Sequence, residues 1–473
     1  MKKLTLFDTY TRDIKPFSPL KNREVRIYAC GPTVYKEAHI GNLSTYIFVD
    51  FLVRYLKFLG YKTMLVRNIT DVGHLTSNAD TGEDKLEVEA KKAKVDPLKI
   101  AEKFTKKFHD DCEKLNLLKP DKEPHAVQNI KEQIEAVGKL IKKGFAYETK
   151  SGIYFDTSKD REYGKLSGLK NDKKLKTKSR VGEISDKKNP LDFALWLKAK
   201  GKFANHLQNW DSPWGVGFPG WHIECSVMSK KILDVPFDIH TGGVDHIPIH
   251  HTNEIAQSKA LYRVNPANFW VHHEFLQFGG KKMAKSKGES ITLDDLEKEE
   301  FSPQDFKFLV LSAHYRTKLN FSFDALSQAQ KNLQTISEFI EATRKYQNTS
   351  PQNYREVIFK DFYNDLCDDL NTPSALGRIF ILMKIYNKKM SANQPIPKVE
   401  IVKLFIDLEK IFGIDFKIFQ KKLPQKAKAL IKKREELRQK GKFAEADKLR
   451  TEITKLGVEI KDTDNGTEWK FKN

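Results

Sequence analysis

The sequence predicts an α/β fold: a Rossmann-like parallel-sheet domain with an inserted connective subdomain, followed by an α-helical bundle and a small C-terminal domain. Three observations near the start favour it. Residues 23–30, "REVRIYAC", read as a strand, residues 41–59 as a helix with an apolar face, and residues 60–70, "GYKTMLVRNIT", as a second strand. Such a βαβ unit begins a parallel sheet whose ligands bind beyond the carboxyl ends of its strands.

Later segments extend this reading. Residues 84–118 and 125–143 have helical periodicity, and residues 145–158 read as a hairpin. Residues 218–280 return to alternating strands and helices, with Gly and His crowded into the turns. After Ser302 the pattern is helical almost to the end, where the last residues, "DTDNGTEWKFKN", are rich in turn formers.

The composition indicates a polyanionic partner. The 473 residues carry 83 Lys and Arg against 63 Asp and Glu, a formal net charge of +20, and nucleic-acid-binding chains commonly have such an excess. Charge alone leaves open that the lysines only solvate the surface. Four scattered Cys give no disulfide framework and favour a reducing cytoplasm. The first residues show no export signal, and no apolar run reaches the roughly 18 residues of a membrane span.

The first chemical motif is "HIGN", residues 39–42, where the loop after the first strand becomes a helix. His39 and Asn42 stand three apart and face the same side of the helix N-terminus, where unpaired backbone N–H groups favour a phosphate. A His at such a position is more often a helix cap than a catalyst, so the motif alone leaves both interpretations open.

The second motif is "GGKKMAKSKG", residues 279–288, a lysine cluster between glycines. Lysines on such a loop can carry positive charge onto a transferring phosphoryl group and withdraw afterwards, although a Lys-rich loop by itself is usually only solvated. The two motifs in this order, one after the first strand and one after the last sheet segment, are more specific than either alone.

With these motifs the chain resembles the class I aminoacyl-tRNA synthetases, whose HIGH and KMSKS signatures it matches except at Asn42 and Ala284. Longer stretches between residues 28 and 469 narrow the resemblance to the cysteinyl-tRNA synthetase family, although Thr252 stands where that family often has Glu. The stretches are YACGPTVYKEAHIGN, VRNITDVGHL, DFALWLKAK, WDSPWGVGFPGWHIECSVM, HTGGVDHIPIHHTNEIAQS, DDLNTPSAL and FAEADKLRTEITKLGVEIKDTDNGTEW. The resemblance implies a ligase that activates L-cysteine with MgATP, releases pyrophosphate, and transfers cysteine from the adenylate to the 3′ end of a tRNA.

By the same resemblance, one zinc ion is held by Cys30, Cys225, His250 and Glu254, at intervals of 195, 25 and 4 residues. Thiolate, imidazole and carboxylate are zinc ligands, and His250 and Glu254 lie on one helical face. Spacing alone does not find the site, because two lone Cys so far apart are more often buried apolar residues. We expect a zinc–thiolate bond to select cysteine, since an apolar pocket separates such small side chains only by about 10- to 200-fold. The substrate sulfur is expected to expand the coordination or to displace Glu254.

The resemblance also implies roles for neighbouring residues. Catalysis by positioning and charge stabilisation is expected from His39, Asn42, Lys282 and Lys285. ATP is expected at His39, Asn42, Gly242, Asp245 and Lys285, and cysteine at Cys30, Gly31, Thr70, Trp221 and His222. His251 stands about 100° round the helix from His250 and is expected to pack beside the zinc site or to support its ligands.

The expected domain boundaries follow the family. The catalytic domain would comprise residues 1–120 and 205–285, the connective insertion 121–204, a stem-contact region with the signature loop 286–345, the tRNA-binding bundle 346–425, and the anticodon-binding domain 426–473. Contacts with the tRNA would then explain the net positive charge, the helical region after Ser302 and the basic residues of the C-terminal domain. Trp469 is a candidate for stacking on an unpaired base or, equally, for a small domain's core. We expect a monomer.

Two other interpretations remain open from the sequence. A cysteine ligase that joins cysteine to the amine of a small sugar would share the zinc and adenylate chemistry, and the tail from Lys426 to Trp469 speaks against it. A catalytically inactive RNA-binding paralogue would lack reactive groups, and this chain retains His39, Lys282, Lys285 and all four expected zinc ligands.

Lys285→Ala should lower cysteinyl-adenylate formation by about 10²- to 10³-fold, the scale of losing one charge-stabilising donor. ATP–pyrophosphate exchange measures this step. An unchanged exchange rate in the variant would remove Lys285 from the mechanism.

Overall fold

The structure is a computed structural model, and it describes residues 2–72, 84–168, 186–204, 206–279, 281–282, 290–350, 357–416, 425–456, 458–463 and 466–471. The chain divides into two compact units, Met1–Asp415 and Phe416–Asn473. In the described ranges, no helix combines the length and hydropathy that crossing a bilayer requires.

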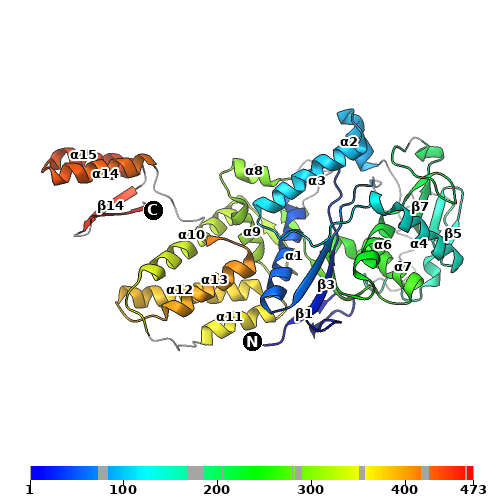
Figure 1. The fold of residues 1–473 in the computed structure, drawn as a ribbon, viewed down its shortest axis with the longest axis horizontal. Helices are drawn as coiled ribbons and strands as arrows, with labels where there is room; N and C mark the ends of the chain where they lie inside the picture. The colour runs from blue at the N-terminus through cyan, green and yellow to red at the C-terminus, as the bar shows by residue number, and fades with distance from the viewer. Residues whose placement is uncertain are drawn as a thin grey trace. The chain divides into compact units, whose positions relative to one another are not determined.

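A four-stranded parallel sheet forms the centre of the first unit. Its strands are β3 (Glu24–Ala29), β4 (Lys62–Arg67), β9 (Phe237–Gly243) and β10 (Ala267–His273), in the order β10-β9-β3-β4. Helix α1 (Ile40–Phe58) packs on one face and α6 (Trp221–Leu233) on the other (Figure 1). Since β9 is buried along its whole length, its seven residues read as apolar or small except for Asp238 and His240. The predicted Rossmann-like sheet is confirmed.

A strand pair and an insertion complete this half of the first unit. The pair β1 (Thr5–Asp8) and β2 (Asp13–Pro16) is antiparallel. The insertion joins helices to a second, antiparallel sheet of order β5-β6-β7-β8, and one apolar core extends from the parallel sheet into it. Its elements are α2 (Lys85–Ala93), α3 (Pro97–Lys114), α4 (Ile130–Lys142), β5 (Ala146–Glu148), β6 (Gly152–Phe155), β7 (Phe193–Lys198) and β8 (Gly217–Pro219).

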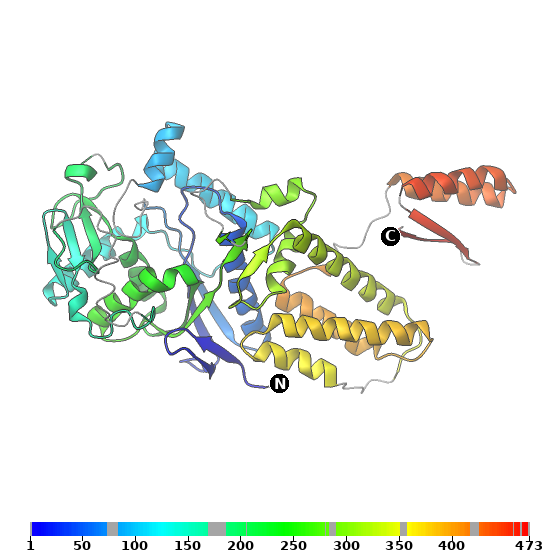
Figure 2. The same cartoon turned by 180° about the vertical axis from the view of Figure 1, so that it is seen from behind.

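The chain then leaves the sheet through a small three-stranded sheet and enters a helical bundle. The small sheet has β12 (Lys281–Lys282), β11 (Leu276–Phe278) and β13 (Leu319–Phe321), in that order. Thr292 and Ser302 begin the next two helices with reciprocal capping boxes. The helices are α8 (Leu293–Lys298), α9 (Pro303–Leu311), α10 (Phe323–Lys345), α11 (Val357–Cys367), α12 (Thr372–Ser391) and α13 (Lys398–Phe412), and Figure 2 shows the last four side by side.

The second unit has its own small core. Helices α14 (Gln425–Gln439) and α15 (Phe443–Lys455) pack together, and Val458 and Ile460 of the following strand join their apolar faces. The C-terminal stretch that the sequence predicts as turn-rich is instead an antiparallel hairpin of β14 (Val458–Thr463) and β15 (Gly466–Phe471). Asp462, Thr463 and Gly466 of this stretch lie within the paired strands.

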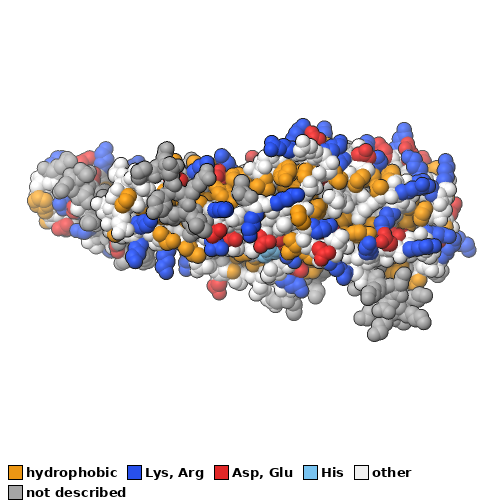
Figure 3. Space-filling model, turned by 90° about the horizontal axis from the view of Figure 1, so that it is seen from below, with side chains coloured by type: hydrophobic (Ala, Val, Ile, Leu, Met, Phe, Trp, Pro, Cys, Tyr) orange, Lys and Arg blue, Asp and Glu red, His pale blue; other side chains and the backbone are white. Residues whose placement is uncertain are grey.

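Basic side chains are distributed over the surface. Figure 3 shows Lys and Arg across one face of the molecule, interleaved with acidic and hydrophobic side chains.

A buried ionic cluster ties the bundle to α1. Lys307 of α9, fully buried, donates to the Asp50 carboxylate of α1 at 2.8 Å and to the carbonyl of Gly413, which follows α13, at 3.2 Å. Arg54 also donates to Asp50 at 2.8 Å. Gly413 has a φ of +63°, and a Cβ there would lie 2.6 Å from both Lys307 Nζ and Arg54 Nε. The cluster thus fixes the end of α13 against the first helix of the sheet.

Lys307→Met should lower the free energy of unfolding by about 3 kcal/mol, because it leaves buried carbonyls and part of the Asp50 charge without their partner. Urea unfolding followed by tryptophan fluorescence measures it. Lys345→Met is the matched control: Lys345 pairs with Glu341 on the exposed surface of α10 and should change stability by less than about 0.5 kcal/mol. Equal effects of the two substitutions would contradict the role of the cluster.

Candidate zinc and nucleotide site

Four side chains that are far apart in the sequence meet at the carboxyl edge of the parallel sheet. Cys30 follows β3, Cys225 lies on α6, His250 lies in the turn before α7 (Thr252–Tyr262), and Glu254 lies in the first turn of α7. Each residue offers one ligand atom, and the four atoms lie within 4.8 Å of one another, all on buried residues. The structure thus brings together the four residues expected to bind zinc.

The turn before α7 is a π-helix, η5 (Ile247–His251). His250 Nε2 lies 3.1 Å from Glu254 Oε1, one turn further on. In this wider turn the neighbouring His251 also points inward, and its Nε2 lies 3.3 Å from Cys30 Sγ. His251 therefore contacts a predicted ligand directly, in agreement with the expectation that it packs beside the zinc site or supports its ligands.

The charges of the cluster are mutually balanced. Burial raises the pKa of Glu254, but His240 and His250 more than offset this effect and hold it well below its ordinary value. Burial lowers the pKa of His250, yet Glu254 and Cys225 raise it to about 10. A hydrogen bond from Cys30 lowers the pKa of the Cys225 thiol to about 6, against the effect of burial. The carboxylate and one thiolate are therefore already ionised.

These groups fit a zinc ion. Two sulfurs, one imidazole nitrogen and one carboxylate oxygen are a zinc donor set. Glu254 Oε1 is buried and makes no well-oriented hydrogen bond despite its short distance to His250. A metal bound here would replace the protons of Cys30, whose pKa is raised by burial and then by Cys225, and of His250, whose pKa is raised, despite burial, by Glu254 and Cys225.

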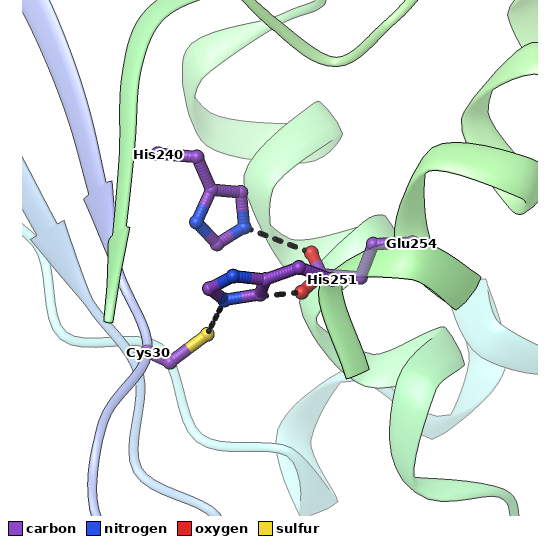
Figure 4. A group of neighbouring side chains, drawn as sticks. All are labelled: Cys30, His240, His251 and Glu254. Atoms are coloured by element: carbon purple, nitrogen blue, oxygen red, sulfur yellow. Dashed lines mark hydrogen bonds and ion pairs between the residues drawn. The ribbon is translucent and has the colours of Figure 1, made fainter. Parts of the chain in front are cut away.

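A second group of donors overlaps the first. It shares Cys30 and Glu254 and adds His240 and His251, again with ligand atoms within 4.8 Å. Figure 4 shows both imidazoles directed at the shared residues, and His240 Nε2 lies 3.0 Å from Glu254 Oε2. Sequence reasoning gave His240 no role. His240 could have been identified because it is a polar residue on a buried strand, β9, and a buried polar side chain needs a hydrogen-bond partner.

The residues expected to bind cysteine surround this cluster. The Trp221 and His250 rings have centroids 4.6 Å apart, and His222 Nδ1 lies 3.0 Å from His250 Nδ1. The Gly31 amide donates to Asn68 Oδ1 at 2.9 Å, and Asn68 Nδ2 donates to Thr70 Oγ1 at 3.0 Å. Cys30 is itself a predicted ligand, Trp221 and His222 contact His250, and Gly31 and Thr70 are linked to the cluster through Asn68, whose Oδ1 lies 3.7 Å from Cys225 Sγ.

Gly31 cannot carry a side chain. A Cβ there would lie 1.4 Å from the carbonyl oxygen of Asn68. This close backbone approach between the segments after β3 and β4 sets the position of the adjacent Cys30. Sequence reasoning assigned Gly31 by resemblance, and the structure supplies a steric reason for glycine at this position.

His39 is the N-cap of α1. Its Nδ1 accepts from the backbone N–H of Asn42 at 3.1 Å, so the proton of the neutral ring is on Nε2. The capping interpretation is therefore correct, and it fixes the tautomer that could bind a phosphate. The carboxyl end of β9 lies nearby: a Cβ on Gly243 would be 3.8 Å from Thr45 Oγ1 of α1 and 2.4 Å from Asp245 Oδ1.

Gly242 also faces the cluster. A Cβ there would lie 2.6 Å from His246 Nδ1 and 3.1 Å from His251 Cε1. The predicted turn after β9 therefore lies between the helix that begins at the HIGN motif and the histidine cluster. Asp245 itself is exposed on this turn.

The lysine loop is anchored at both ends. Its first end is β12, where Lys282 pairs with Gln277 of β11. After the loop, the carbonyl of Ile291 accepts from the amide of Ile40, beside His39, at 2.9 Å. The Lys282 side chain and Lys285 lie outside the described residues. The anchors nevertheless bring both ends of the loop to the small sheet and the start of α1.

Comparisons with known proteins agree with this geometry. Models of the class I (C) tRNA synthetase catalytic domain, the DALR domain and the cysteinyl-tRNA ligase anticodon binding domain match residues 16–331, 361–417 and 420–469, respectively. A Mycobacterium tuberculosis methionyl-tRNA synthetase in complex with methionyl-adenylate has a similar fold, with a TM-score of 0.57 and 14% identity over 82% of this chain and 89% of that one. Fold and signature motifs together define a class I aminoacyl-tRNA synthetase.

Sequence relatives give the family. Cysteine–tRNA ligases from Bacteroides fragilis and Treponema denticola are 38% and 37% identical, each over 99% of both chains. The enzyme of that name from Deinococcus radiodurans is 37% identical over 99% of this chain and 96% of its own. The chain belongs to the cysteine–tRNA ligase family.

The zinc assignment predicts a metal content of one ion per chain. Cys225→Ser should weaken zinc binding by more than about 100-fold, because changes outside the ligand set alone cost 10- to 100-fold. Competition with a chromophoric chelator measures the affinity. Cys112→Ser is the control, since Cys112 is buried beside Arg67 and away from the cluster. Equal zinc affinities of the Cys225 and Cys112 variants would contradict the assignment.

Proposed function

We propose that the chain activates L-cysteine with MgATP and transfers the cysteinyl group to the 3′ end of a tRNA, with selection of cysteine at Cys30, Cys225, His250 and Glu254. The family makes it an ATP-dependent ligase. The observation that carries the proposal is the convergence of these four donors, with Trp221 and His222 against His250, at the edge of the sheet where the HIGN helix begins.

The selectivity has a physical basis in the donor set. Cysteine and serine differ by one atom, and an apolar pocket separates such pairs by only about 10- to 200-fold. Bound zinc supplies a soft Lewis acid that a thiolate satisfies and a serine hydroxyl matches poorly. Glu254 is the oxygen ligand that we expect to loosen, because its carboxylate would keep His240 Nε2, 3.0 Å from Oε2, as a partner after leaving the metal.

The nucleotide would bind at the N-terminus of α1. His39 caps this helix, and the backbone N–H groups of the first turn favour the triphosphate. Asn42, Gly242 and Asp245 would border the nucleotide, and Lys282 and Lys285 would bring charge onto the α-phosphate as the cysteine carboxylate attacks it. Little covalent chemistry is asked of side chains in such a transfer, so positioning and Mg²⁺ charge carry most of it.

The tRNA would meet the rest of the chain. Helices α11–α13 and the second unit coincide with the DALR and anticodon-binding matches, and the net charge of +20 favours a polyanion. Both features disfavour a ligase acting on a small amine. Anticodon stacking by Trp469, a cytoplasmic location and a monomeric state remain predictions.

The primary experiment is cysteine-dependent ATP–pyrophosphate exchange on zinc-loaded protein, with serine as the competitor and with tRNA added afterwards. We expect exchange with cysteine only, its loss after chelation, and transfer to a tRNA with a cysteine anticodon. Exchange without transfer to any tRNA would indicate the small-amine ligase, and absence of exchange would indicate an RNA-binding protein.

Removal of the second unit should impair the transfer of cysteine to tRNA but not the activation of cysteine with ATP. A chain of residues 1–419 retains the first compact unit and should keep cysteine-dependent exchange within about twofold of the full chain. Its kcat/KM for tRNA acylation should fall at least about tenfold, because anticodon contacts are lost. A truncated chain that acylates tRNA as efficiently as the full chain would contradict the assigned role of the second unit.

A further inference from the structure

A line of hydrogen bonds leads from the N-terminal segment to Cys30. The Thr9 hydroxyl lies 2.8 Å from His272 Nδ1, His272 Nε2 lies 2.7 Å from His251 Nδ1, and His251 Nε2 lies 3.3 Å from Cys30 Sγ. His272 and His251 are buried. Figure 4 shows the last of these contacts, with the His251 ring pointing at the sulfur. None of the motifs discussed above includes Thr9 or His272.

The direction of these bonds is determined from the sulfur end. A metal-bound thiolate accepts hydrogen bonds and donates none, so His251 Nε2 must carry a proton to bond to it. A neutral imidazole has one N–H, so the Nδ1 atom of His251 carries no proton and accepts from His272 Nε2–H. His272 Nδ1 is left as an acceptor, and the Thr9 hydroxyl is the donor that satisfies it.

We propose that Thr9 is a positioning residue for the zinc site: through His272 and His251 its hydroxyl fixes the N–H group that donates to the Cys30 sulfur. The proposal rests on the zinc site of the proposed function. An N–H···S bond withdraws electron density from the thiolate, so the metal keeps more Lewis acidity for the substrate sulfur.

Thr9 is held where this role requires it. Its amide donates to the carbonyl of Trp270 at 2.9 Å, and the amide of Trp270 donates to Asp8 Oδ1 at 3.0 Å. The segment after β1 is therefore fastened to β10, the strand that carries His272. The Trp270 ring in turn stacks on His240, with centroids 4.5 Å apart, beside Glu254. Strand β10 therefore supports both the line of hydrogen bonds from Thr9 through His272 and His251 to Cys30, called the relay below, and the surroundings of Glu254.

The first test compares Thr9→Val with Thr9→Ser. Valine has nearly the shape of threonine but lacks the hydroxyl, and serine keeps it. We expect Thr9→Val to weaken zinc binding about 2- to 10-fold, the effect of one net hydrogen bond. In Co²⁺-substituted protein its sulfur-to-cobalt charge-transfer band should move to longer wavelength. Thr9→Ser should restore both. Equal effects of valine and serine, or no effect of valine, would overturn the proposal.

Thr11→Val is the matched control for local folding. The Thr11 hydroxyl bonds to Asp8 Oδ2 in the same turn but takes no part in the relay. Its substitution should leave zinc affinity and the cobalt spectrum unchanged. A band shift like that of Thr9→Val would assign the effect to the turn as a whole and would overturn the relay.

A double-mutant cycle tests whether Thr9 acts through His272. His272→Phe should weaken zinc binding, and adding Thr9→Val to it should have no further effect. Additive losses would overturn the proposal. His251→Gln should still bind zinc, because its amide can donate to Cys30, whereas complete loss of zinc would place His251 among the ligands and reverse the relay. A wild-type chain that binds no zinc would instead refute the proposed site.

Discussion

The buried carboxylate of Glu254 is the group on which the arrangement of the site depends. A carboxylate removed from water is stable only with close partners, and Glu254 has His240 on one oxygen and His250 near the other. Those imidazoles then fix their neighbours: Trp221 and His222 pack on His250, and Trp270 stacks on His240. The walls of the expected cysteine pocket are thus positioned by the same charge that would bind the metal.

The parallel sheet explains why these groups meet. Its strands end at one edge, so Cys30 after β3, Gly242 near the end of β9 and His272 near the end of β10 come together although they are distant in sequence. The bundle is joined to α1, which packs on this sheet, through the pair of Asp50, in the middle of α1, with Lys307 of α9. Catalytic edge and bundle therefore share α1 as a common rigid element.

Periodicity and turn chemistry were enough to predict the sheet, α1 and the hairpin of the insertion, because these features are local. The zinc ligands came from family resemblance, since 195 residues separate the two sulfurs and only the folded sheet brings them together. The contact of His251 with Cys30 Sγ agrees with the expectation that it supports the zinc ligands, although the turn is a π-helix and not the α-helix that the 100° spacing assumes. Thr9 and His272 carry no sequence signature: their link is a tertiary contact between the N-terminal segment and the end of β10.

The central claim is that the substrate sulfur binds the zinc held by these residues. X-ray absorption at the zinc edge counts sulfur neighbours directly. The account predicts two sulfur atoms, from Cys30 and Cys225, at about 2.3 Å in the free protein, a third when L-cysteine is added, and no third with L-serine. A sulfur number that stays at two with cysteine bound would contradict selection by a zinc–thiolate bond.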